Sequence, residues 1–152
     1  RTPMTVRALC NHNVATTSRN AGVADAAALM RAEHVGDLIV VEERGGKRVP
    51  VGILTDRDIV VAVVAKRVAA SDVTVGDAMS GELLTVREDN GVEHALREMR
   101  RVGVRRAPVV DGSGSLIGVL SIDDVIDHVA VQLGHIADII RVGQRAEADH
   151  RR

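Results

Sequence analysis

The chain of 152 residues carries a formal net charge of −1, with 20 Lys and Arg residues interspersed among 21 Asp and Glu residues. This balance argues against a surface that binds a polyanion. The chain has no Phe, Tyr or Trp, so it lacks the aromatic rings on which nucleic-acid modules stack bases. We therefore expect no nucleic-acid partner.

The apolar content is sufficient for a core but not for a membrane span. Hydrophobic residues make up 45% of the chain, which suits one domain or two small intertwined ones. No apolar run approaches the length of a membrane span, and neither end carries a secretory h-region, so we expect no membrane partner and a cytoplasmic location. Cys10 is the only cysteine, which excludes an intrachain disulfide.

Apolar periodicity and turn residues predict an alternation of helices and short strands along the first half of the chain. Helices are expected at 5–10, 23–32 and 59–65, and extended segments at 14–17, 38–41 and 49–54. Arg44-Gly45-Gly46-Lys47 is typical of a hairpin turn between the last two strands.

The second half repeats the first. Thr5-Val6 recurs as Thr74-Val75, 69 positions later, and Gly22-Val23 recurs as Gly91-Val92 at the same spacing. Near the end of each copy the spacing falls to 66, so the first copy has three extra residues around 42–51. A common spacing over most of the chain indicates a duplication. The second copy predicts helices at 74–79 and 92–101, and extended segments at 83–86, 105–110 and 116–120.

Each copy ends in the same motif, Gly, two aliphatic residues, Thr or Ser, two further residues and Asp, at 52–58 and again at 118–124. Thr55 is expected at a helix N-cap, where the free N–H groups and the helix dipole attract anions. Asp58, one turn later, could accept two hydrogen bonds from a diol. A hydroxyl and a carboxylate so placed suit a nucleotide. The alternative is a capping box in which Asp replaces the usual Glu.

The repeat and its closing motif resemble the CBS domain, and two in tandem resemble a Bateman module of the stand-alone two-CBS type. The resemblance covers about residues 5–133 and includes the segment 103–110, which is similar to the helix-to-strand junction of the family. It implies an α/β (α+β) fold with two repeats packed about a pseudo-twofold, each a small three-stranded sheet with two helices. The expected units are repeat 1 at 1–70, repeat 2 at 71–135, and a helix end with a charged tail at 136–152.

The resemblance also implies two clefts that take an adenosine-containing ligand: AMP, ADP, ATP, NAD or S-adenosylmethionine. Carried onto this chain, the first cleft joins Thr55 and Asp58 to Thr85, Val104, Arg105 and Arg106. The second joins Ser121 and Asp124 to Thr16, Val35, Gly36 and Asp37. Arginines near the first cleft favour phosphates, whereas the extra carboxylates Asp37 and Asp123 suit the second to a less anionic adenosyl group, or leave it weak or empty. Without aromatic residues, adenine would lie between aliphatic side chains.

These patterns favour a non-enzymatic regulatory module with no obligatory cofactor, which passes its signal to an unknown downstream protein. An enzyme would need a second catalytic group beside Asp58 or Asp124, and the sequence suggests none. A ligand-free structural or partner-binding protein is the other alternative. Cys10 and His12 supply only two ligands of the four that structural zinc requires, so no metal site is expected.

The last helix differs from its counterpart in the first copy. Ile126, Val129, Leu133, Ile136 and Ile140 alternate steps of three and four, a coiled-coil-like spacing over about two heptads. This stripe favours a homodimer contact or, equally, an ordinary amphipathic helix packed on its own domain. The charged residues from Gln144 onward are expected to be frayed.

Overall fold

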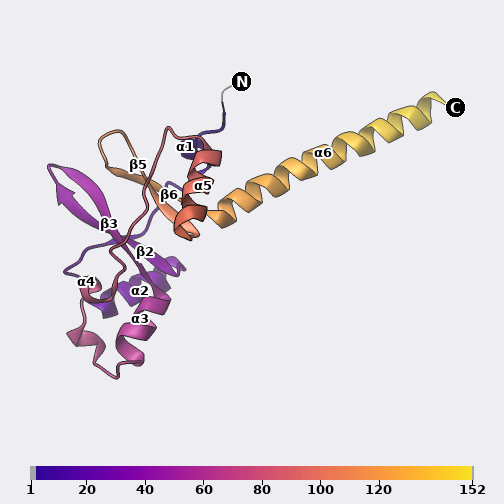
Figure 1. The fold of residues 1–152 in the computed structure, drawn as a ribbon. Helices are drawn as coiled ribbons and strands as arrows, with labels where there is room; N and C mark the ends of the chain where they lie inside the picture. Colours follow the sequence, from indigo (N-terminus) through magenta and orange to yellow (C-terminus); the bar gives the residue numbers. More distant parts are fainter. Residues whose placement is uncertain (1–2, 152) are drawn as a thin grey trace.

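The computed structural model describes residues 3–151, which form two small mixed sheets joined side by side (Figure 1). The first sheet has the order β1-β2-β3, and the second has the order β4-β5-β6. In both sheets the first pair of strands is parallel and the second pair is antiparallel. The strands are β1 (Thr16–Thr17), β2 (Asp37–Arg44), β3 (Lys47–Thr55), β4 (Val86–Arg87), β5 (Arg106–Val110) and β6 (Leu116–Ser121). The predicted α/β class with two three-stranded repeats is confirmed.

The helices follow the same duplication. They are α1 (Val6–Leu9), α2 (Val23–Glu33), α3 (Asp56–Ile59), α4 (Val75–Ala78), α5 (Val92–Val102) and α6 (Ile122–His150). Both long helices that precede a central strand end in a left-handed residue, His34 after α2 and Gly103 after α5. A left-handed C-cap satisfies the last carbonyl groups and turns the chain toward the next strand. Gly45 and Gly46, both with positive φ, form the predicted two-residue hairpin.

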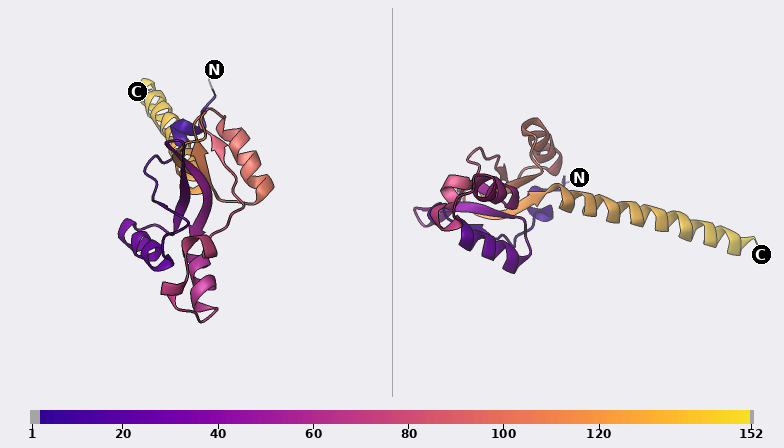
Figure 2. Two further views of the ribbon diagram at one scale, coloured as in Figure 1. Left: turned by 90° about the vertical axis from the view of Figure 1, so that its left-hand side faces the viewer. Right: turned by 90° about the horizontal axis from the view of Figure 1, so that it is seen from below.

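The two repeats exchange their first helices. Val6 of α1 lies before the first sheet in sequence, but it is fully buried in the core of the second sheet. Val75 of α4 is likewise buried in the core of the first sheet. The segments after these helices pair with the opposite hairpins, Asn11 with Val119 and Ser80 with Ile53. The views in Figure 2 show the two halves intertwined at this level. Separating them would therefore expose both cores.

This exchange accounts for the glycine that opens each motif. A Cβ atom at Gly52 would lie 2.8 Å from the carbonyl oxygen of Ser80, and one at Gly118 would lie 2.8 Å from the carbonyl oxygen of Asn11. Any side chain at these positions would push the paired segment away. Both copies of the motif thus begin with a close approach of two backbones.

Two helical predictions are corrected. The regular helix expected at 59–65 is a short α-helix followed by a π-helix, Val60–Val64, in which the Ala65 N–H donates to the Val60 carbonyl. Four of these five residues are β-branched valines, which crowd a regular α-helix. The tail expected to be frayed from Gln144 is helical to His150. It is rich in Ala, Gln, Glu and Arg, which have high helix propensity.

Candidate functional site

Each motif places its hydroxyl residue at the start of a helix, as the sequence predicts. The Asp58 N–H donates to Thr55 Oγ1 at 3.1 Å, and the Asp124 N–H donates to Ser121 Oγ at 3.1 Å. Thr55 and Ser121 are therefore N-caps, and both end a strand that comes from the core. The first N–H group of each helix also donates within the chain, Asp56 to the Gly36 carbonyl and Ile122 to the Arg105 carbonyl, so these bonds fix both helix starts at the junction between the repeats.

The two motif carboxylates are used differently. Asp58 Oδ2 accepts the Thr55 N–H at 2.9 Å, which completes the capping box that the sequence left open. Thr74 and Asp77 form the same box at α4, where backbone and side-chain hydrogen bonds from Thr74 lower the pKa of Asp77. Asp124 has no such bond. Within residues 3–151 its carboxylate accepts no hydrogen bond, so it is available to a ligand.

The Ser121 cleft lies between the repeats and has a volume of about 230 Å³. It brings together four of the predicted residues, Ser121, Asp124, Val35 and Asp37. Thr16 does not line it, because Thr16 Oγ1 accepts from Arg48 Nη2 at 2.7 Å on a neighbouring surface. Gly36 faces the other cleft. The remaining lining residues are Asn11, Asn13, Val14, Ala15, Ile39, Arg106, Val119 and Asp123.

Asn11 and Asn13 were missed from the sequence. They lie in the segment that follows α1, and only the exchange of first helices carries this segment to β6. Nothing local marks the two residues, because Asn-rich segments are common in turns. Their amides add uncharged donors and acceptors to a cleft that also holds aliphatic and charged side chains.

The Thr55 cleft is a more open depression of about 460 Å³ on the other side of the junction. It joins Thr55 to Val104, Arg105 and Arg106, as predicted, and adds Gly36, Asp37, Ile53 and Asp56. Asp58 and Thr85 do not line it. Asp56 takes the place expected for Asp58, since its N–H donates to the Gly36 carbonyl at 2.9 Å and holds it at the edge of the cleft. The binding roles of these residues stay predictions.

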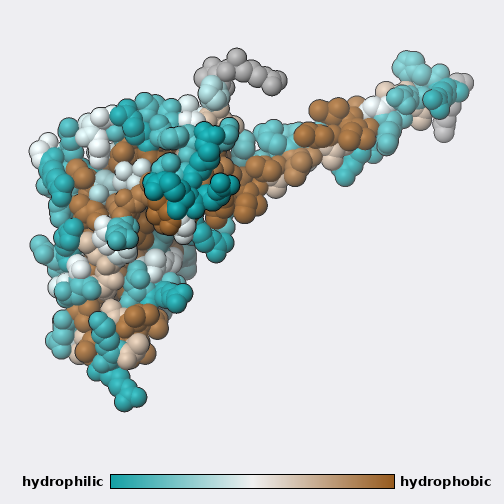
Figure 3. All heavy atoms as spheres, viewed as in Figure 1, coloured by the Kyte–Doolittle hydropathy of each residue, from teal (hydrophilic) through white to brown (hydrophobic). Residues whose placement is uncertain are grey.

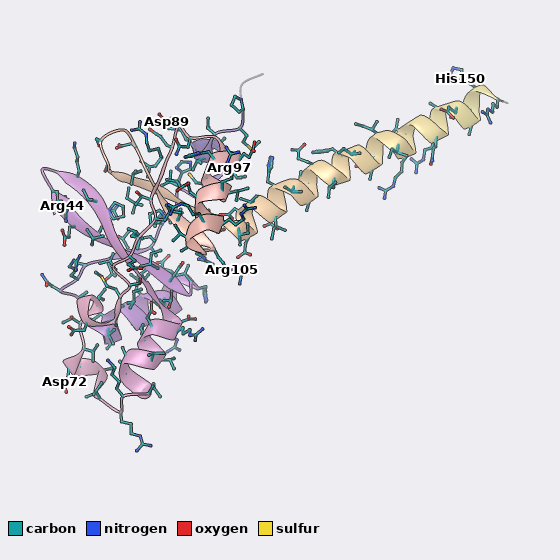
Figure 4. All side chains as sticks on the ribbon, viewed as in Figure 1. Arg44, Asp72, Asp89, Arg97, Arg105 and His150 are labelled. Carbon is teal, nitrogen blue, oxygen red and sulfur yellow. The ribbon has the colours of Figure 1, made fainter. Side chains whose placement is uncertain are left out.

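Arg106 is not available as a free cation. Its Nη1 donates to both carboxylate oxygens of Asp37, at 2.8 and 2.9 Å, and the pair borders both clefts. In the Thr55 cleft this leaves Arg105, labelled in Figure 4, and the Asp56 carboxylate, one charge of each sign; Arg105 forms no ion pair within residues 3–151. In the Ser121 cleft it leaves Asp123 and Asp124, two carboxylates in excess. The two clefts therefore differ in charge.

Cys10 and His12 lie together near β6. Cys10 Sγ is 3.7 Å from His12 Nε2, and burial raises the pKa of the Cys10 thiol. Both ring nitrogens of His12 already face backbone carbonyls, Ile117 and Arg7, at 3.1 Å. Among residues 3–151 no three His, Cys, Asp or Glu side chains are grouped to hold a metal ion. No helix in this part of the chain is long and apolar enough to cross a membrane.

A comparison with known families decides the assignment. The model described as "CBS domain" matches residues 6–65 and again residues 75–131. The chain belongs to the CBS-domain family. The two matches confirm the predicted tandem pair, and each of them covers one of the two motifs.

Individual relatives agree. The CBS domain-containing protein YhcV of Bacillus subtilis is 35% identical over 112 residues, which cover 74% of this chain and 76% of that protein. The uncharacterized protein MK0525 of Methanopyrus kandleri is 34% identical over 123 residues, which cover 81% of this chain. The match spans only 61% of the length of MK0525.

Solved structures have the same fold. A hexameric CBS-CP12 protein from bloom-forming cyanobacteria is 31% identical, with a TM-score of 0.69 over 81% of this chain and 69% of that one. The CBS domain pair of protein MJ0100, solved in complex with 5′-methylthioadenosine and S-adenosyl-L-methionine, is 24% identical. Its TM-score is 0.72 over 86% of this chain and 98% of that one.

Proposed function

We propose that this CBS pair is a non-enzymatic regulatory module that senses an adenosine-containing ligand between its repeats. The module would form a homodimer. Ligand binding would change the conformation or the assembly of that dimer, and a downstream protein would respond to the change. The proposal contains no chemical step. An enzymatic alternative would use Asp58 or Asp124 as a base; Asp58 is bound to the Thr55 N–H, and the proposal gives Asp124 a ligand-binding role instead.

The observation that carries the proposal is the free carboxylate of Asp124 inside the Ser121 cleft. A carboxylate without a protein donor can accept both hydroxyl groups of a ribose, and hydrogen bonds to a charged group are the stronger kind. Val14, Val35, Ile39 and Val119 line the same cleft and offer aliphatic walls for the adenine ring.

The two clefts differ in charge, and this difference favours a different class of ligand in each cleft. Asp123 and Asp124 repel phosphate, so the Ser121 cleft suits an uncharged or cationic adenosyl ligand such as S-adenosylmethionine or 5′-methylthioadenosine. MJ0100 holds these two ligands on the same fold, which supports the choice of compounds. Arg105 suits the Thr55 cleft to AMP, ADP, ATP or NAD.

The first experiment is a thermal-shift screen followed by calorimetric titration with these ligands. With no Phe, Tyr or Trp, the protein absorbs little near 260 nm, so an adenine retained through purification would dominate that region and could be identified by mass spectrometry. Saturation at about a thousand times Kd adds about 4 kcal/mol to the free energy of unfolding. If no ligand shifts the transition at millimolar concentration, the ligand-free structural alternative is favoured.

The second experiment assigns the cleft. Asp124→Asn keeps the N-cap but removes the charged acceptor, and we expect about a 10- to 100-fold loss of affinity for the adenosyl ligand. Asp127→Asn is the matched control, because Asp127 is an exposed aspartate one turn further along α6 that does not line the cleft. Equal affinity in the wild type and Asp124→Asn would remove the assignment to this cleft.

A further inference from the structure

Helix α6 is much longer than the element to which it corresponds. In the first repeat, α3 and the π-helix end at Val64, and the spacing of 66 makes Ala130 the equivalent residue. From there α6 continues through 20 residues to His150, a length of about 30 Å. Figures 1 and 2 show this extension projecting from the body as a rod.

The projecting part is strongly apolar. Its large exposed hydrophobic side chains are Val131, Leu133, Ile136, Ile139, Ile140 and Val142, each at least 55% exposed. They form brown patches along the rod in Figure 3. A helix needs an apolar face buried against something to be stable in water, and exposed apolar surface of this extent marks an interaction site.

One stripe of this surface runs without a break from the body into the extension. It consists of Ile126, Val129, Leu133, Ile136 and Ile140, which are 49–61% exposed and repeat in steps of three and four. We call this stripe the seam. Its spacing is that of the a and d positions of a heptad.

The residues that flank the seam indicate which kind of helix can pack against it. In heptads whose a and d positions are the seam, the e and g positions are Ala130, Gln132, Ala137, Ile139, Gln144 and Ala146. None is charged, whereas charges at these positions normally select or reject a partner helix. A second copy of α6 therefore meets no repulsion, and Ile139 adds apolar surface beside the seam.

The sequence of the seam favours an antiparallel pair. If Leu133 lies opposite Ile136 of a second copy, then Val129 lies opposite Ile140 and Ile126 lies opposite Gly143. Ile126 then fills the space left by the glycine, whereas a parallel pair would set two glycines together and leave a void. Ile126 is 58% exposed, so the body leaves this end of the seam open.

The charges outside the seam do not oppose this direction. Asp127 and Arg141 occupy the same outer heptad position, and the antiparallel register brings Asp127 level with Arg141 of the second copy, although Arg141 Nη1 also pairs with Asp138 of its own helix at 2.9 Å. The helix dipoles also oppose each other in this arrangement. We propose that the seam is a self-association surface, covered by α6 of a second copy in antiparallel orientation. The contact involves neither cleft, so it does not depend on the proposed ligand.

Sedimentation velocity of the full chain tests whether a second copy covers the seam. We expect the wild type at about 100 µM to sediment with at least twice the mass of one chain. The double variant Leu133→Asp/Ile136→Asp should weaken the contact at least about 100-fold and so halve the sedimenting mass. Val131→Asp is the control, because it places the same charge on an equally exposed residue that lies outside the seam. It should leave the mass unchanged, and circular dichroism should show equal helicity in the wild type and Val131→Asp.

Three results would overturn the proposal: a monomeric wild type, an assembly that survives the seam substitutions, or an equal loss in Val131→Asp. Cysteine cross-linking tests the direction. In the antiparallel register a chain with both Val129→Cys and Ile140→Cys forms disulfide dimers, but Val129→Cys alone does not, because its two copies lie about 16 Å apart along the pair. Efficient dimers of Val129→Cys alone would establish a parallel pair and refute the antiparallel one. The natural Cys10 is buried, which keeps it out of the reaction.

Discussion

Arg106 Nη1 donates to both carboxylate oxygens of Asp37, and the two residues, 69 positions apart, occupy the same place in their repeats. Each is the first residue of a central strand, Asp37 in β2 and Arg106 in β5. The pseudo-twofold brings these positions together, so identical charged residues would repel each other there. The duplicated halves have instead diverged to opposite charges, and the resulting pair connects the two clefts.

A double-mutant cycle will show that this pair stabilises the contact between the repeats. Arg106→Ala leaves Asp37, whose side chain is only 16% exposed, without its partner, and we expect a loss of about 1–2 kcal/mol in the free energy of unfolding. Asp37→Ala should cost less, because Arg106 is 43% exposed and can reach water. Urea denaturation of the two single variants and the double variant measures the coupling. As a control, Arg87→Ala breaks a pair whose side chains are both more than half exposed, and it should change stability little.

The same pair sets the charge that a ligand meets. Asp37→Asn releases the Arg106 guanidinium into both clefts, so we expect affinity for ATP to rise about tenfold while affinity for 5′-methylthioadenosine changes little. Calorimetric titration of both ligands is the measurement. Equal changes for the charged and the uncharged ligand would show that Arg106 does not contact the phosphates.

The capping box predicts a structural cost at Asp58. Asp58→Ala removes the acceptor of the Thr55 N–H, and we expect a loss of about 0.5–2 kcal/mol, seen as a melting temperature lower by roughly 1–8 °C. Asp77→Ala removes the same bond at α4, away from either cleft, and is the matched control for stability. A loss of ligand affinity in Asp58→Ala that exceeds the loss in Asp77→Ala would assign Asp58 a binding role as well. Equal affinities would restrict Asp58 to capping.

The motif glycines should not tolerate even a methyl group. Gly52→Ala and Gly118→Ala place a Cβ 2.8 Å from a backbone carbonyl of the exchanged segment, and we expect each to destabilise the protein by about 1–3 kcal/mol. Gly134→Ala meets no atom within 4 Å and lies inside α6, so it should stabilise the helix by up to about 1 kcal/mol. Thermal unfolding followed by circular dichroism compares the three. If Gly118→Ala unfolds at the wild-type temperature, the backbone at Asn11 can move away from a methyl group without cost.

The sequence by itself determined the repeat, the family and most elements. Apolar periodicity located α2 and α5, Gly45-Gly46 located the hairpin, and the spacing of hydroxyl and carboxylate residues located both N-caps. These features depend on residues within one or two turns of each other, so local pattern is sufficient to predict them.

The tertiary structure alone decided which groups meet. The exchange of α1 and α4 between cores, the placement of Asn11 beside Ser121 and the pairing of Arg106 with Asp37 all join residues far apart in sequence. The motif predicts equal roles for Asp58 and Asp124, but one carboxylate binds its own N-cap and the other faces a cleft. A carboxylate takes whichever donor lies within hydrogen-bond distance, and the fold decides which donors those are.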